Sequence, residues 1–332
     1  MNRNLKYAYR MVWVGLLTSI LLFGSGIFAQ AKVTLRLGHI FPVLHPTHKA
    51  VTAMADYATK ASNGALEIKV YSGGALGKGN TLAENISMGT VDMGTAGPGL
   101  LGRLEPAWGL IAGEYVFKNV DSMFKVLNGP VGVEIKERLV KKRGMRVVGI
   151  GYLGQRNLTA NKPVKTPADL KGLKIRIPNI ALRKASFVAL GAAPTPMAFS
   201  EVYLALQQGV VDGQENPLAQ IVAAKFYEVQ KYLILTEHAL NPEILLINEK
   251  KFQGLSADLR KILMEGATVY QTTSFDEFKK LKYELLEKVI DGGMIVMKPD
   301  IESFRKAVRD VPYKFEKKWG EGLYDRVLKA QE

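Results

Sequence analysis

Leu173-Lys-Ile-Arg-Ile-Pro178 is the stretch of sequence on which the fold prediction depends most. Its apolar side chains alternate with polar ones, so they share one face of a strand and Lys174 and Arg176 share the other. Thr166-Pro-Ala-Asp169 precedes it and favours a helix start, because threonine caps, proline suits the first helical position and the acid reaches back. With Gly172 as the helix stop, these segments predict a short helix followed by a strand.

The same alternation continues on both sides of this unit. Strands are predicted at 33–40, 66–71, 91–95, 146–152, 193–197, 210–215, 233–236 and 244–248, and helices at 46–63, 81–88, 121–143, 181–190 and 199–208. Strands that alternate with helices at this spacing favour parallel α/β units.

A proline-free helical pattern runs from Ser256, a good cap, to the stop signal Gly292-Gly293. A helix of this length spans roughly 50 Å, which is more than one small domain. We therefore expect it either to cross from one lobe to the other or to kink near Gly266.

The N-terminus has the features of an export signal. Arg3, Lys6 and Arg10 precede an apolar run over 11–28, and the small-x-small pattern Ala29-Gln30-Ala31 follows. The alternative is a retained membrane anchor, since the run is near the length that spans a bilayer. The flanking charges and small residues favour a cleaved signal peptide, which would comprise residues 1–31.

Composition narrows the function classes. The chain has 332 residues, 47% hydrophobic and 23% charged, with no cysteine and a net charge of +14. This length favours two globular domains. The lack of cysteine excludes disulfides, thiolate metal sites, a thiol nucleophile and a lipoprotein anchor. Basic residues are scattered among acids, without interleaved aromatic side chains, so nucleic acid is not an expected partner.

Motifs of catalysis and cofactor binding are missing from the sequence. His45 and His48 have a spacing that suits a metal, but no third ligand stands nearby and there is no HExxH motif. The sequence also lacks GxSxG, P-loop and GxGxxG patterns, and the glycine-rich segment 73–79 favours a turn. We therefore predict no metal, no cofactor and no catalytic residues.

Two arginines and an asparagine are candidates for binding. Arg156 follows the predicted strand 146–152, and Arg176 lies near the end of its own strand, where ligands gather in α/β sheets. A guanidinium presents a rigid fork to a carboxylate, although each arginine could instead form a structural salt bridge. Asn216 could hydrogen-bond a ligand oxygen or simply belong to an Asn-Pro turn.

The sequence resembles the substrate-binding proteins of tripartite ATP-independent periplasmic (TRAP) transporters over nearly the whole mature chain. The segments that carry the resemblance are 154–159 (GQRNLT), 166–179 (TPADLKGLKIRIPN) and 209–216 (GVVDGQEN). It implies an α/β, two-lobed periplasmic binding protein fold, with a sheet flanked by helices in each lobe and a long bridging helix over 256–291. Lobe I would comprise 32–152 plus 242–281, and lobe II 153–241 plus 282–332.

The resemblance also implies the roles of individual residues. Arg176 matches the arginine that pairs with the ligand carboxylate, Arg156 a second ligand-contacting arginine, and Asn216 an asparagine that holds the carboxylate or its neighbouring oxygen. A further set of residues would pack an aromatic side chain against the solute or line the cleft. It comprises Phe199, Pro178 and Asn179 from the second lobe, and Phe41, His45 and the 78–80 segment with Asn80 from the first.

The function implied is capture of a small organic acid in the periplasm by a monomer, followed by delivery to the membrane permease subunits of a TRAP transporter. The sequence does not decide whether the solute is a C4-dicarboxylate, a sugar acid, a 2-oxo acid or an aromatic acid. Members that bind sialic acid carry charged residues after the third strand, whereas 94–100 is uncharged here; sialic acid is therefore not expected. Two alternatives are an exported enzyme acting on a carboxylated sugar, with Glu215, Asp212 or a histidine as base, and a membrane-tethered solute sensor.

Overall fold

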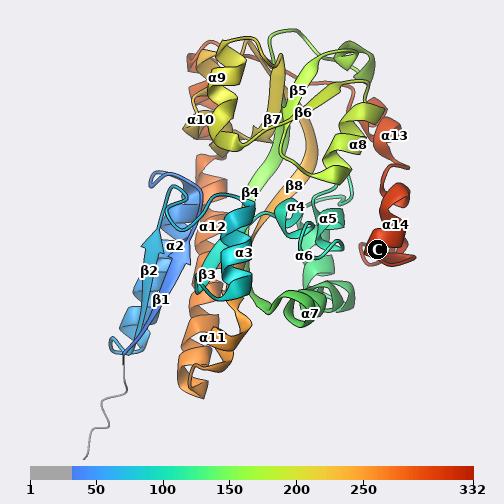
Figure 1. Ribbon diagram of the computed structural model, residues 1–332. Helices are drawn as coiled ribbons and strands as arrows, with labels where there is room; N and C mark the ends of the chain where they lie inside the picture. The colour runs from blue at the N-terminus through green and yellow to red at the C-terminus, as the bar shows by residue number, and fades with distance from the viewer. Residues whose placement is uncertain (1–31) are drawn as a thin grey trace, which may run out of the picture. The chain divides into compact units, whose positions relative to one another are not determined.

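A single mixed sheet of nine strands organises the residues that the computed structural model describes, 32–332 (Figure 1). The strand order is β2-β1-β3-β8-β4-β7-β5-β6, and β9 pairs with β8 beside this path. The strands are β1 (Val33–Gly38), β2 (Leu66–Tyr71), β3 (Met93–Ala96), β4 (Met145–Ala160), β5 (Lys174–Ile177), β6 (Ala193–Pro196), β7 (Gly213–Pro217), β8 (Tyr232–Asn248) and β9 (Ile295–Met297). The predicted signal peptide lies outside the described residues.

Two long antiparallel strands, β4 and β8, connect the two halves of this sheet. β3 pairs with the end of β8 near Ile247, whereas β7 pairs with the end of β4 near Ala160. Figure 1 shows both strands running from the lower to the upper group of helices. The halves therefore share a continuous sheet.

The sequence prediction of separate strands at 146–152, 233–236 and 244–248 in parallel α/β units is wrong for this part of the sheet, because β4 and β8 are long and antiparallel. Three register shifts interrupt the pairing of β4 with β8, and Gly154 adopts a left-handed φ of 94°. Pro242 stands inside β8, opposite Tyr152. These irregularities break the alternation of side chains, and the local pattern therefore hides one long strand.

Helices cover both halves of the sheet. Those of eight or more residues are α2 (Pro46–Ala61), α3 (Asn80–Met88), α6 (Val120–Asn128), α7 (Pro130–Arg143), α8 (Ala181–Ala189), α12 (Ala257–Asp291) and α13 (Ile301–Val308). The shorter ones are α4 (Pro98–Leu101), α5 (Trp108–Ile111), α9 (Val202–Gln207), α10 (Leu218–Ala223), α11 (Glu249–Gln253), α14 (Glu316–Trp319) and α15 (Leu323–Lys329).

The predicted long helix is confirmed as α12, which continues through Gly266. Ser256 caps it by accepting a hydrogen bond from the backbone amide of Leu259 at 3.3 Å, and Gly292 follows its last residue. Gly266 lets α2 approach closely, since an added Cβ would lie 3.3 Å from Met54. The helix contacts α2 and β4 along one part and α10 along another, so it bridges the two halves.

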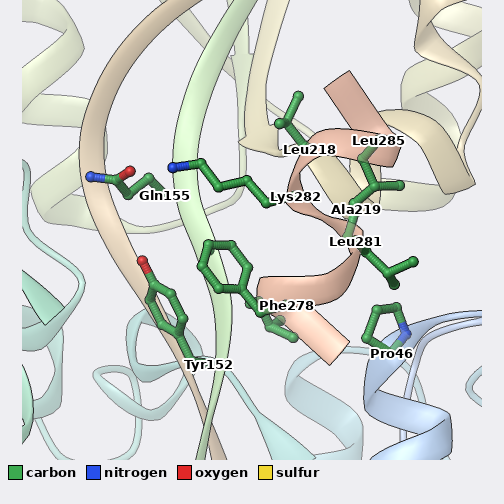
Figure 2. Close-up of a pocket in the computed structure, with 11 residues that line it drawn as sticks. Pro46, Tyr152, Gln155, Leu218, Ala219, Phe278, Leu281, Lys282 and Leu285 are labelled. Atoms are coloured by element: carbon green, nitrogen blue, oxygen red, sulfur yellow. The ribbon is translucent and has the colours of Figure 1, made fainter. Parts of the chain in front are cut away.

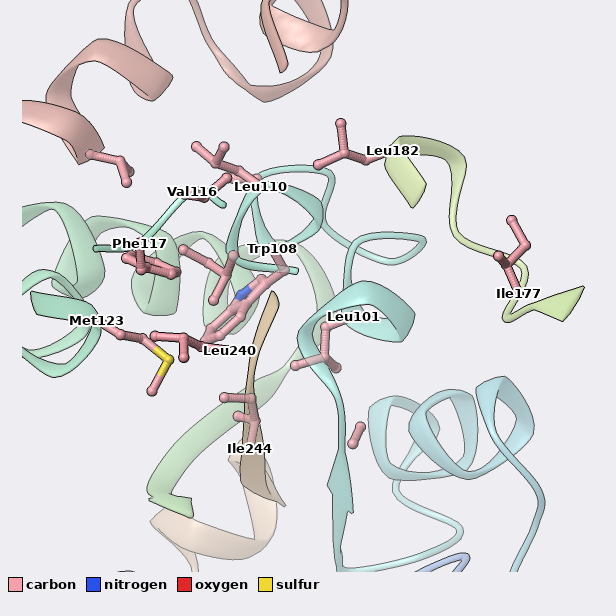
Figure 3. Close-up of a cluster of buried hydrophobic side chains, with 14 of the residues drawn as sticks. Leu101, Trp108, Leu110, Val116, Phe117, Met123, Ile177, Leu182, Leu240 and Ile244 are labelled. Carbon is pink, nitrogen blue, oxygen red and sulfur yellow. The ribbon is translucent and has the colours of Figure 1, made fainter. Parts of the chain in front are cut away.

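Two clusters of buried hydrophobic side chains bear on the position of the site. The larger one centres on Trp108, which is fully buried, and extends to Ile244 of β8, Ile177 of β5 and Leu182 of α8 (Figure 3). A second cluster around Phe226 packs α9, α10 and the end of α12 together. Apolar packing of this kind holds the strand ends rigidly, which positions the polar side chains described next.

Candidate functional site

A cavity of about 530 Å³ is lined by residues from both halves of the sheet. Arg176, Arg156 and Asn216 line it from one half, together with Phe199, Pro178 and Asn179, and Phe41 and Asn80 line it from the other. The structure therefore brings all the predicted site residues except His45 to one cavity. Its volume suits a small organic solute.

Arg176 is a buried guanidinium without a carboxylate partner in the described part of the chain. It lies in β5, as predicted, and its side chain is 3% exposed. Its Nε and Nη2 donate to the carbonyl oxygen of Met197 at 3.2 and 2.8 Å. Burial lowers the pKa of Arg176 to about 10, so the side chain stays charged at neutral pH. A positive fork is thus held in place at the cavity wall.

Arg156 forms the salt bridge that was the alternative to ligand binding. Its Nε and Nη2 both donate to the carboxylate of Glu215, and Nη2 also donates to Asn216 Oδ1 at 2.9 Å. Its Nη1 donates to Asn241 Oδ1 at 3.2 Å. Arg156 lies inside β4 rather than after a strand, because β4 continues to Ala160. It still borders the cavity, but most of its donors already have partners.

Asn216 is oriented by these contacts. It lies within β7, which runs to Pro217, so it is not merely a turn residue. Its Oδ1 accepts from Arg156, and its Nδ2 donates to Gln214 Oε1 at 2.6 Å. An amide nitrogen carries two hydrogens, so one remains for a ligand.

Glu215 is the centre of a buried charge network. Arg183 Nη1 donates to Glu215 Oε2 at 3.1 Å, and His238 Nε2 lies 3.0 Å from the same oxygen. Burial alone would raise the pKa of Glu215, but Arg156 and Arg183 outweigh it and hold that pKa well below its usual range. A carboxylate so strongly ionised is a poor general base at neutral pH. Asp212, the other candidate acid, accepts from the backbone amide of Lys174 at 2.8 Å.

Phe199 and Phe41 bring aromatic surface to the cavity. The Arg176 guanidinium carbon lies 6.0 Å from the centroid of Phe199, at the edge of cation–π distance. Phe41 stacks on His45 with ring centroids 4.0 Å apart. Both rings offer apolar faces next to cationic and polar groups.

His45 is not among the residues that line the cavity, so its expected place in the cleft is not found. It is the N-cap of α2, where Nδ1 accepts from the backbone amide of Thr47 at 3.1 Å. Burial lowers the pKa of His45 to about 3, which keeps the ring neutral. His45 therefore packs against Phe41 without lining the cavity itself.

Sequence reasoning missed several charged and polar lining residues, among them Arg103, Glu243 and Gln220, whereas Lys78 belongs to the predicted 78–80 segment. Lys78 and Arg103 are exposed on the first-half side, while Glu243 and Gln220 are buried. The 94–100 segment adds no charge, as expected, but these residues place charge in the same cavity. Glu243 stands between Pro242 and the apolar run 244–247, and an acid in such a setting is the only sequence signal for it.

A smaller cavity of about 40 Å³ lies against α12. Figure 2 shows Phe278 and Leu281 of this helix beside Tyr152 of β4 and Leu218 of α10. Its lining is mostly apolar, and it has room for no more than a few waters. It is therefore not a second site for an organic acid.

No helix in the described range is both long and apolar enough to span a bilayer.

Comparison with known proteins identifies the class. The family model "Bacterial extracellular solute-binding protein, family 7" (DctP) matches residues 37–318, and the chain belongs to this family. It is a TRAP transporter substrate-binding protein, as the resemblance implied, and its relatives are binding proteins rather than enzymes.

The relatives bind different acids. A solved TRAP periplasmic solute-binding protein from Roseobacter denitrificans, with bound L-galactonate, is 34% identical, has a TM-score of 0.84, and the match covers 92% of this chain and 100% of that one. The 2,3-diketo-L-gulonate-binding periplasmic protein YiaO of Escherichia coli is 36% identical over 79% of each chain. The sialic acid-binding periplasmic protein SiaP of Vibrio cholerae is 31% identical over 93% of this chain and 96% of its own.

Proposed function

We propose that this protein captures a sugar acid or related small carboxylate in the periplasm and delivers it to the membrane permease subunits of a TRAP transporter. The observation that carries the proposal is Arg176, a buried cation in a 530 Å³ cavity without a protein carboxylate beside it in the described residues. A solute carboxylate that replaces water at this fork gains charge-assisted hydrogen bonds.

The rest of the proposed site completes the grip on the solute. Asn216 donates its free amide hydrogen to the carboxylate or a neighbouring oxygen, while Arg156 fixes Asn216 and borders the ligand. Phe199 and Phe41 pack against the carbon chain. The lining residues Pro178, Asn179 and Asn80 contact its remaining parts.

Charge-assisted hydrogen bonds contribute about 1.5–3 kcal/mol each, whereas micromolar affinity needs about 8 kcal/mol. One arginine is therefore not sufficient. We infer that lobe I (32–152 plus 242–281) and lobe II (153–241 plus 282–332) close over the solute and add the missing contacts. Tyr152 and Pro242 face each other in the sheet, so two of the three crossings between the inferred lobes are adjacent, and the third lies within α12.

A thermal-shift screen against organic acids tests the proposal, with mass spectrometry of any co-purified solute. We expect one or more sugar acids to raise the melting temperature, because binding to the native state alone stabilises it. The matched control is the neutral alcohol of the same carbon chain, such as galactitol beside galactonate, which lacks the carboxylate. Equal shifts with both compounds, or no shift with any acid, would contradict the proposal.

Export is part of the same proposal. Cleavage after Ala31 would release the chain into the periplasm as a soluble monomer, whereas a retained segment would make it a tethered sensor. N-terminal sequencing of the periplasmic protein distinguishes the two: the first predicts a start at Lys32, and the second predicts an intact N-terminus.

A further inference from the structure

Glu243 lies two residues along β8 from Asn241, which contacts the arginine network. Asn241 accepts a hydrogen bond from Arg156 at 3.2 Å, and Asn241 and Glu243 both line the cavity. Residues two apart on a strand share a face and lie about 7 Å apart. The Glu243 carboxylate therefore belongs to the wall that continues from the arginines into the first half of the sheet.

The surroundings of Glu243 leave its carboxylate open to a solute. The residue is 3% exposed, and none of the ion pairs within residues 32–332 includes it. Gly97, which also lines the cavity, presents no side chain to it: an added Cβ would lie 4.0 Å from Glu243 Oε2. An acid that is buried without a cation normally has a specific reason to be there.

Two other acceptors in the cavity lack donors. Asn80 Oδ1 and Gln220 Oε1 are buried, and neither has a hydrogen-bond partner in the described structure. Buried polar atoms are nearly always paired, so a ligand with several hydrogen-bond donors fits this part of the cavity. Hydroxyl groups donate, whereas an ionised carboxylate only accepts.

We propose that Glu243 is a specificity-determining residue that accepts hydrogen bonds from hydroxyl groups on the solute tail and excludes solutes with a second carboxylate there. This inference rests on the proposed function, in which Arg176 holds the first carboxylate. It selects polyhydroxylated monocarboxylates among the acids that suit an arginine-anchored cavity.

Lys78 and Arg103 do not reverse this preference. Both line the cavity, but both side chains are exposed, and exposed ion pairs contribute little because water screens them. Glu243 is buried, where like charges repel strongly. A second carboxylate at this wall therefore meets a larger penalty than the two cations offset.

The preference depends on pH. Burial raises the pKa of Glu243 to about 7, and the nearby hydroxyl of Thr95 lowers it only in part. Tyr270 of α12 donates to the Glu243 backbone oxygen, and burial keeps its own pKa well above the usual value. Arg176, with a pKa of about 10, stays charged throughout. Between pH 6 and pH 8, ionisation of Glu243 therefore strengthens the discrimination against solutes with a second carboxylate.

Calorimetry with matched acid pairs tests the inference. Each pair has the same carbon chain, with either one terminal carboxylate or two: galactonate and galactarate, gluconate and glucarate, erythronate and tartrate. At pH 8 we expect the wild type to bind the better monoacid at least about 10-fold more tightly than its diacid. Glu243→Gln should reduce that ratio to within about 3-fold, since the amide removes the repelling charge.

Two further arms separate the possible failures. In the wild type the ratio should fall as the pH drops from 8 to 6, which needs no variant, and Glu237→Gln, on the same strand but outside the cavity lining, should behave as wild type. An unchanged ratio in Glu243→Gln, or a ratio independent of pH, overturns the role of Glu243 while sugar-acid binding stands. If neither these pairs nor any acid of the thermal-shift screen binds the wild type, the proposed function itself fails, and the inference with it.

Discussion

Two buried ionisable side chains in the cavity, Arg176 and Glu243, form no ion pair in the described structure, and burial is the largest influence on the pKa of each. It lowers the pKa of Arg176 to about 10 and raises that of Glu243 to about 7. The arginine remains ionised at neutral pH, whereas Glu243 is poised to change charge. By contrast, the neighbouring Glu215 is ionised because Arg156 and Arg183 outweigh its burial.

Glu243 should make folding less favourable as the pH rises. Its folded pKa of about 7 exceeds the ordinary glutamate pKa of 4.5, which applies in an unfolded chain, so its contribution to stability is fully present below pH 4.5 and is lost as the pH rises through 7. A difference of this size corresponds to about 3 kcal/mol.

Urea unfolding of wild type and Glu243→Gln at pH 5 and at pH 8 measures this contribution without any ligand. We expect the variant to gain in stability relative to wild type between the two pH values, because glutamine does not ionise. If the two stability profiles run parallel with pH, Glu243 does not titrate as stated.

At the scale of elements, the crossing of β4 past α12 depends on a glycine. Gly154 has a φ of 94°, and an added Cβ would lie 2.6 Å from Phe278 Cε2. Gly154→Ala should therefore lose about 1–2 kcal/mol for the left-handed backbone and a further 1–3 kcal/mol for overpacking.

Gly172→Ala is the matched control for that variant, since Gly172 has a φ of 77° and nothing within 4 Å of an added Cβ. Chemical denaturation should show the smaller loss for Gly172→Ala, and Phe278→Leu should partly rescue Gly154→Ala. Equal losses in the two alanine variants would mean that the contact with α12 is not tight.

The elements differ in how far the sequence predicts them. The cap formed by Asp169, which accepts from the backbone amide of Thr166 at 2.8 Å, and the strand and long helix that follow were predicted because their signals are local. The full lengths of β4 and β8 were not, since Gly154 and Pro242 interrupt the side-chain alternation. Arg176 was found by its strand and by resemblance, while Glu243 needs the fold to bring β8 to the cavity.

For the whole molecule, the arrangement of charge suits the capture of an anion. The sequence carries a net charge of +14, and the exposed Lys78 and Arg103 border a cavity whose inner wall holds Arg176. Positive charges around a cleft raise the local concentration of an anionic solute. The shared strands β4 and β8 and the bridging α12 leave few connections to bend between the two halves. We therefore expect the two halves to close around the fixed guanidinium of Arg176.

Isothermal titration calorimetry with the best acid from the screen, on wild type, Arg176→Lys and Arg176→Ala, tests this central claim most directly. Lysine keeps the charge but loses the fork, so we expect affinity to fall about 10- to 100-fold and binding by the alanine variant to become undetectable. Arg260→Lys, at a half-buried position of α12 outside the cavity lining, should bind as wild type does. Near-normal affinity in both Arg176 variants would contradict the account.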